Sequence, residues 1–320
     1  MMKRKSIIIL IIILMVTIPI VFSVFYNDKG LVIEVKKNKK LGFLTNYYIY
    51  IPKGINKSQL NYILVEPNNT GKVSDDHLVH EKNVLKKIEL GFSRQIADEL
   101  KVPLLIPVFD RLESNWKMYT HALDRDTLQN KDGDLRRIDL QLLNMVDDAT
   151  QILRDKKIKV SKKFLLTGFS ASGNFVNRFA VLHPERVQSV VAGGVNCMPI
   201  LPEPKLGDEK LIYPIGIYDI EEISGQKFDF SKYSQIPQYI YMGSDDENDT
   251  LFYDDAFSDK ERKLIISVLG IKMHDRWKIS KEVYRKLGLP VELVMYKGIG
   301  HKINNEVKND IILFLKRTIN

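Results

Sequence analysis

Blocks of apolar residues recur along the chain, and their spacing predicts strands and helices in alternation. Residues 31–35 and 47–51 have the pattern of an antiparallel pair of strands that opens the folded part. Short apolar runs without a period of two are typical of strands buried on both faces. Such runs lie at residues 62–65, 102–108, 163–167, 187–192, 239–242 and 291–296.

Between these runs the apolar residues recur at helical spacing. Helices are predicted at residues 84–100, 135–154, 175–182, 259–287 with a break near Gly270, and 305–318. Residues 195–235 are irregular and rich in Pro, Gly and Tyr, which makes them a candidate cap or insert. The alternation predicts an α/β fold whose mostly parallel central sheet has helices on both faces. In such sheets the chemistry lies at the carboxyl ends of the strands.

The N-terminus has the pattern of a targeting or anchoring segment. Lys3, Arg4 and Lys5 precede an uncharged apolar stretch at residues 6–25, which as one hydrophobic helix would be about 30 Å long, enough to cross a bilayer. We expect either a cleaved signal peptide or a membrane anchor within residues 1–27. The length of the stretch favours the uncleaved anchor. Because the basic residues stay in the cytoplasm, residues 28–320 would lie outside it, as one domain anchored to the membrane or secreted.

The charge and cysteine content exclude some classes of function. The 48 basic and 40 acidic residues give a net charge of +8, spread along the chain without a basic cluster. Nucleic-acid binding requires such a cluster, so no nucleic-acid partner is expected. The single cysteine, Cys197, excludes an intramolecular disulfide and a zinc site built from several cysteines. We expect Cys197 to be a small buried apolar residue.

A serine lies between a predicted strand and a predicted helix, where a nucleophile would be exposed. Residues 168–172 have the form G-x-S-x-S, with Ser170 at the turn. Small residues are needed two positions before and after such a serine, because strand and helix approach closely there. Gly168 and Ser172 fill these positions. The following helix would direct the backbone N–H of Ala171 toward a developing oxyanion. The alternative is a tight turn with a capping serine.

Residues 168–194 resemble the nucleophile turn, helix and next strand of the α/β-hydrolase superfamily, in particular secreted esterases and polyester-depolymerase-like members. The order of elements is similar over nearly the whole part after the N-terminal segment. The chain departs from the family after Val65, where many members have His-Gly and this sequence has Glu66-Pro67-Asn68-Asn69. The substrate class is therefore not implied by the resemblance.

The resemblance implies a catalytic order of serine, acid and histidine along the chain. Of the histidines after Ser170, His301 follows the last predicted strand, whereas His183 ends the helix after Ser170 and His274 lies within a helical stretch. His301 is therefore the expected general base. The family often has Gly-x-x-Asp after the strand at residues 239–242, which indicates Asp246 as the acid, with Asp245 and Asp249 as rivals.

Two further groups complete the expected site. The loop after residue 65 would supply a second oxyanion donor from Asn68 or Asn69, although a polar turn without this role is the alternative. The long loop at residues 109–127 follows a strand and would form part of the substrate pocket through Trp116, Tyr119 and His121.

Together these features predict an extracytoplasmic serine hydrolase that uses Ser170, His301 and Asp246 and needs no metal or cofactor. The expected reaction is hydrolysis of a carboxylic ester, small or polymeric. A serine peptidase on the same fold is the first alternative, because the same triad serves both reactions. An inactive membrane-tethered binding domain is the second.

Overall fold

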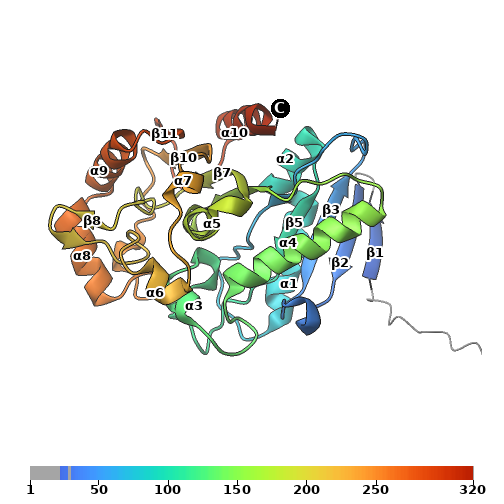
Figure 1. Cartoon of the computed structure of the whole chain (residues 1–320), viewed down its shortest axis with the longest axis horizontal. Helices are drawn as coiled ribbons and strands as arrows, with labels where there is room; N and C mark the ends of the chain where they lie inside the picture. The colour runs from blue at the N-terminus through green and yellow to red at the C-terminus, as the bar shows by residue number, and fades with distance from the viewer. Residues whose placement is uncertain (1–21, 28–29, 320) are drawn as a thin grey trace, which may run out of the picture.

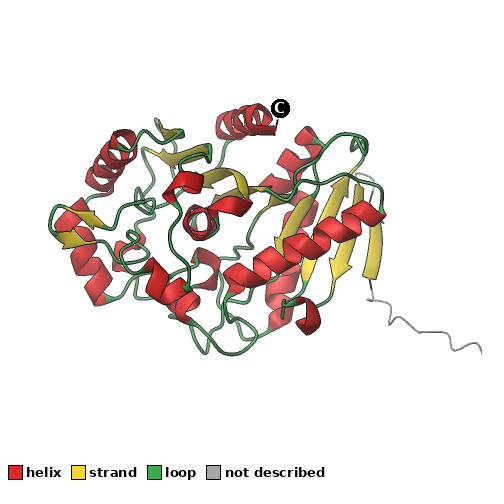
Figure 2. Cartoon of the chain, viewed as in Figure 1, coloured by secondary structure: helices red, strands yellow, loops and turns green. Residues whose placement is uncertain are grey.

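The computed structural model describes residues 22–27 and 30–319, and its centre is a nine-stranded sheet (Figures 1 and 2). The order across the sheet is β1-β2-β3-β5-β4-β6-β7-β10-β11. The strands are β1 (Phe22–Asn27), β2 (Gly30–Val35), β3 (Tyr47–Pro52), β4 (Leu64–Val65), β5 (Leu104–Pro107), β6 (Phe164–Phe169), β7 (Val187–Gly193), β10 (Gln238–Gly243) and β11 (Val291–Tyr296). From β5 to β11 all neighbouring strands are parallel, while β1, β2 and β3 add an antiparallel edge.

Helices cover both faces of this sheet. They are α1 (His77–Leu90), α2 (Phe92–Leu100), α3 (Arg125–Gln129), α4 (Ile138–Asp155), α5 (Ala171–Leu182), α6 (Ile220–Ser224), α7 (Phe230–Tyr233), α8 (Asp259–Leu269), α9 (Met273–Lys286) and α10 (Asn305–Ile319). Apolar residues of α4, α5, α8 and α9 share one buried cluster with one face of the sheet. Those of α1, α2 and α10 form a second cluster with the opposite face. The predicted mostly parallel sheet with helices on both faces is therefore confirmed.

Several predicted elements differ in detail from the structure. The helix expected at residues 84–100 is two helices, α1 and α2, which meet at Gly91. A Cβ at Gly91 would lie 2.3 Å from the Lys87 carbonyl oxygen, so only glycine permits this sharp junction. The break expected near Gly270 is present between α8 and α9. The strand expected at residues 62–65 is reduced to β4.

The segment at residues 195–235 packs mainly as cover. Apart from α6, α7 and the short strands β8 (Lys205–Leu206) and β9 (Glu209–Lys210), it is irregular. Its side chains Leu201, Leu211 and Ile215 are buried in the same cluster as α5. Cys197 is also buried there, as expected, and burial raises the pKa of its thiol to about 12.

Most of the apolar N-terminal stretch lies outside the described residues. Its last residues belong to β1, which pairs with β2 in the antiparallel register Val24↔Ile33. Within residues 22–27 and 30–319, no helix combines the length and the apolarity that crossing a membrane requires. The predicted signal peptide or anchor at residues 1–27 stays a prediction.

Candidate active site

Ser170 occupies the turn between β6 and α5, and its backbone is strained. Its φ of 61° and ψ of −125° lie in a region that residues with a side chain rarely adopt. The turn is held on the neighbouring strand, because the Ser170 N–H donates to the Gly193 carbonyl oxygen over 2.9 Å. Such strain raises the serine above the carboxyl edge of the sheet at the first turn of a helix.

Small residues around Ser170 allow strand and helix to approach closely. A Cβ at Gly168 would lie 2.1 Å from the Ser172 carbonyl oxygen, and one at Gly173 would lie 2.3 Å from that of Gly193. Ser172, in the position where glycine is commoner, is buried. Its hydroxyl donates to the Phe169 carbonyl oxygen over 2.9 Å and accepts from the Phe169 N–H over 3.0 Å. The serine variant of the motif therefore adds two hydrogen bonds across the turn.

His301 and Asp246 are in direct contact. His301 lies in the loop after β11, and its Nδ1 is 2.8 Å from Oδ2 of Asp246, which follows β10. The Asp246 carboxylate is almost fully buried, and its Oδ1 accepts the Asn248 N–H over 2.9 Å. A buried carboxylate in this position fixes the orientation and the tautomer of the imidazole ring.

The two rival acids are engaged elsewhere. Asp245 is exposed and accepts a hydrogen bond from the neighbouring Ser244 hydroxyl. Asp249 forms an ion pair of 2.7 Å with Arg276, a fully buried arginine of α9, and also caps a 3-10 helix that begins at Thr250. In the part of the chain that the structure describes, Asp246 is the one candidate of the three that is hydrogen-bonded to His301.

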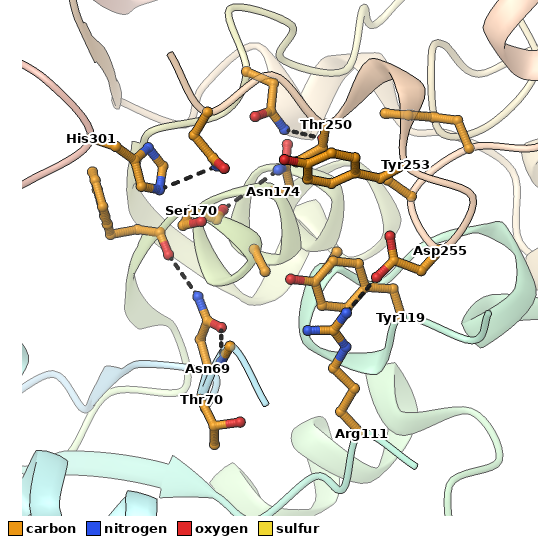
Figure 3. Close-up of a pocket in the computed structure, with 18 of the residues that line it drawn as sticks. Asn69, Thr70, Arg111, Tyr119, Ser170, Asn174, Thr250, Tyr253, Asp255 and His301 are labelled. Carbon is orange, nitrogen blue, oxygen red and sulfur yellow. Dashed lines mark hydrogen bonds and ion pairs between the residues drawn. The ribbon is translucent and has the colours of Figure 1, made fainter. Parts of the chain in front are cut away.

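The second ring nitrogen of His301 faces the same cavity as Ser170 (Figure 3). In the structure, His301 Nε2 lies 3.4 Å from Nδ2 of Asn248. The ring packs against Phe169 with 4.6 Å between centroids. Gly194 leaves room for it, since a Cβ there would lie 3.0 Å from His301 Cε1. Among the described residues, the hydrogen-bond partner of His301 Nε2 is thus Asn248 rather than Ser170. The Ser170 hydroxyl must come within hydrogen-bonding distance of Nε2 before a proton can be transferred.

The cavity beside Ser170 has a volume of about 550 Å³ and is open on one side. Residues from the end of β6, from α5 and from the loops after β4, β5, β7, β10 and β11 line it. They are Asn69, Thr70, Gly71, Arg111, Tyr119, Ala122, Phe169, Ser170, Ala171, Asn174, Arg178, Asn196, Asn248, Thr250, Tyr253, Asp255, Ala256, Phe257 and His301. Its size suits a small ligand or one end of a longer one.

The expected oxyanion residues divide into two groups. Ala171 and Asn69 line the cavity, and the Asn69 amide is oriented by donating to the Phe169 carbonyl oxygen over 3.2 Å. Asn68 is buried away from the cavity. Its side chain donates to the Phe109 carbonyl oxygen over 2.9 Å and accepts the Phe109 N–H over 2.8 Å. Asn68 thus joins the loops after β4 and β5.

Of the three residues expected to bind substrate, only Tyr119 lines the cavity. Trp116 is exposed outside the cavity lining, with Lys117 over its ring. His121 is buried behind the cavity wall, where its Nε2 lies 2.9 Å from the Phe109 carbonyl oxygen and 3.1 Å from the Asn68 amide. Burial lowers the pKa of His121 to about 3, so the ring is neutral and holds loops together.

Sequence reasoning missed the polar residues on the far side of the cavity. Asn174 and Arg178 follow Ala171 at helical spacing, so all three share one face of α5. Their polarity in a largely apolar helix was a signal in the sequence. Tyr253 and Asp255 come from the loop after Asp246, and nothing in their spacing indicated a role.

Comparison with solved structures identifies the fold. A poly(aspartic acid) hydrolase from Sphingomonas sp. KT-1 is 17% identical, with 91% of this chain and 95% of that chain covered and a TM-score of 0.54. A poly(3-hydroxybutyrate) depolymerase from Bordetella parapertussis is 18% identical, with 84% and 83% covered and a TM-score of 0.52. An S-formylglutathione hydrolase from Agrobacterium tumefaciens is 13% identical, with 92% and 97% covered and a TM-score of 0.52.

No protein-family model matches the sequence, and no curated protein matches it. The structural likeness at this low identity establishes the architecture and not the activity. The chain has the α/β-hydrolase fold, as the resemblance at residues 168–194 implied.

The close approach at the Ser170 turn predicts a specific loss of stability. We expect Gly168→Ala to lower the free energy of unfolding by about 1–3 kcal/mol, because its Cβ would overlap backbone atoms that cannot yield without moving α5. Urea unfolding measures this difference. Gly300→Ala is the control, since its Cβ would be 3.5 Å from the nearest atom, and a change within about 0.5 kcal/mol is expected. Equal stabilities of Gly168→Ala and wild type would contradict this explanation.

Proposed function

We propose that the protein is a serine hydrolase that cleaves carboxylic esters with Ser170, His301 and Asp246. The observation that carries the proposal is the arrangement around one cavity. A strained serine at the first turn of α5 and a histidine held by a buried carboxylate both line it. Strained backbone and a buried acid next to a histidine are costly features that recur at sites of nucleophilic catalysis.

In the proposed reaction, Ser170 Oγ attacks the ester carbonyl and its proton passes to His301 Nε2. Asp246 holds Nδ1 and stabilises the imidazolium that forms. The developing oxyanion lies at the positive end of α5, where the Ala171 N–H donates, together with a donor from the Asn69 loop. The imidazolium then protonates the leaving alcohol, and a water molecule repeats the sequence to release the acid. For the first step, Asn248 must give up its contact with Nε2.

The similar structures support the same chemistry at a coarser level. Their names describe hydrolases and a depolymerase, and the 13% identical S-formylglutathione hydrolase acts on a thioester according to its name. The poly(aspartic acid) hydrolase shares the fold equally well. The names of these similar structures support hydrolysis in general, whereas the choice of an ester bond is part of the proposal.

Labelling with a fluorophosphonate tests the nucleophile directly. We expect the full-length protein to form a covalent adduct on Ser170, found by peptide mapping, because the probe phosphonylates activated serines with loss of fluoride. Ser170→Ala should give no adduct. His301→Ala should slow labelling by about 100-fold or more, since the general base is lost.

A matched control separates activation from folding. Ser172→Ala removes a buried hydroxyl next to the turn and should leave Ser170 labelled, although more slowly. Cooperative unfolding in urea shows that the wild-type sample is folded. If such a sample were not labelled, the proposal would be refuted. That result would favour the alternative of an inactive binding domain.

The bond that is cleaved can be decided with one ester and one amide of the same acyl group. We expect the ester to be cleaved much faster than the amide, because 4-nitrophenolate can leave without a proton whereas an amine leaves only after His301 has protonated it. Release of 4-nitrophenol from the ester and 4-nitroaniline from the amide is followed by absorbance. Comparable catalytic efficiencies, as kcat/KM, would instead support the peptidase alternative.

We further propose that residues 28–320 act outside the cytoplasm, held at the membrane or released there. The support is the sequence of the N-terminal stretch, in which Lys3, Arg4 and Lys5 precede an apolar run. Protease added to intact cells should then digest the protein while a cytoplasmic marker survives. Digestion only after the cells are lysed would refute this location.

A further inference from the structure

The wall of the cavity carries two arginines whose charges the proposed ester hydrolysis does not use. Arg178 comes from α5, and Arg111 comes from the loop after β5. Both side chains are largely removed from solvent, at 4% and 8% exposure for the whole residues. Placing guanidinium groups in such surroundings costs free energy unless an anion balances them.

Arg178 is paired with a backbone group. Its Nη1 donates to the Ala122 carbonyl oxygen over 2.8 Å, and among the described residues no carboxylate lies within ion-pair distance of it. Burial lowers the pKa of Arg178, yet an arginine stays protonated at neutral pH. Asp124 is one of the acids whose charge acts on it, but Asp124 accepts the backbone N–H groups of Tyr119 and Thr127. Arg178 is therefore a buried cation that faces a cavity.

Among the described residues, the Arg111 guanidinium has one acidic partner and one nitrogen without a hydrogen bond. Its Nη2 forms an ion pair with Asp255, and its guanidinium lies 3.9 Å from the centroid of the Tyr119 ring. Its Nε is buried without a hydrogen-bond partner. Figure 3 shows Arg111, Tyr119 and Asp255 together, on the opposite side of the cavity from His301. The residues that line the cavity include two arginines, Arg111 and Arg178, and one carboxylate, Asp255. This wall therefore has a net positive charge.

We propose that this wall binds a carboxylate of the substrate, so that the preferred substrate is an ester carrying a negative charge. Arg178 is the main partner, and Arg111 adds positive charge from the facing loop. The inference rests on the proposed function, because it places the charged group relative to Ser170. A guanidinium suits a carboxylate since its planar donors match both oxygens.

The helix sets where the carboxylate lies. Arg178 is eight residues after Ser170, which corresponds to about 12 Å along α5. Side chains on a helix lean toward its N-terminus, so the guanidinium lies closer to Ser170 than its Cα does. The bound carboxylate is therefore several bonds away from the carbonyl that Ser170 attacks. A dicarboxylic acid that is esterified at one end has a carboxylate at such a distance from the ester carbonyl. A polyester chain that ends in a free carboxylate has one too.

Two matched pairs of substrates test this inference with the full-length protein. In the first pair, mono-4-nitrophenyl adipate carries a carboxylate on the acyl chain and 4-nitrophenyl hexanoate does not. In the second, 3-carboxyphenyl acetate carries it on the leaving group and phenyl acetate does not. We expect kcat/KM to favour the charged member of at least one pair by about 10- to 100-fold, the usual effect of a charged hydrogen bond.

Variants of the two arginines test whether they cause the preference for the charged ester. In Arg178→Gln the preference should fall to near unity, and in Arg111→Gln it should fall by about 3- to 10-fold, since Arg111 is also held by Asp255. Arg94→Gln is the matched control. Arg94 is 2% exposed and donates to the Ile88 carbonyl oxygen over 2.8 Å, yet it lies outside the cavity lining. It should keep the wild-type preference.

Three results would each overturn the inference. One is the absence of a preference for the charged member of either pair in wild-type protein. The second is a preference that survives Arg178→Gln, and the third is a preference that falls equally in Arg94→Gln. Fluorophosphonate labelling of Ser170 in the same samples separates the two proposals. Labelling without charge preference removes this inference alone, whereas no labelling removes the proposed function as well.

Discussion

The close approach of β6 to α5 around Ser170 is the constraint on which the site depends. Backbone atoms of Ser172 and Gly193 occupy the space that side chains at positions 168 and 173 would need. This contact forces a strained backbone at Ser170 and places it at the positive end of α5. The cost is offset by the burial of α5 between the sheet and the segment at residues 195–235. The packing of α5 thus stabilises the chain against the strained backbone at Ser170.

The same edge of the sheet brings distant residues together. The loops after β10 and β11 carry Asp246 and His301, and parallel neighbouring strands end side by side, so the two loops meet. The Asp249–Arg276 ion pair fixes the first of these loops against α9. A buried cation and its partner outside the cavity lining therefore help to position the Asp246 carboxylate.

The strands and the serine turn could be predicted because their signals are local. Apolar runs indicated the sheet, and the small residues around Ser170 indicated the turn. Loop side chains could not be placed in this way, as Trp116 and His121 show. Both were expected to bind substrate, and the turns between them direct one to solvent and the other into a buried hydrogen-bond network. Arg178 was missed because helical spacing alone does not tell which face borders a cavity.

The central claim is that Ser170 attacks a carbonyl whose oxygen is stabilised at the first turn of α5 while His301 takes the proton. A crystal structure of the protein after reaction with a phosphonate inhibitor tests it most directly. The account predicts a bond from phosphorus to Ser170 Oγ, with the phosphoryl oxygen within hydrogen-bonding distance of the Ala171 N–H. It also predicts that Asn248 has left His301 Nε2. Phosphorus on another residue, or a phosphoryl oxygen directed away from α5, would contradict it.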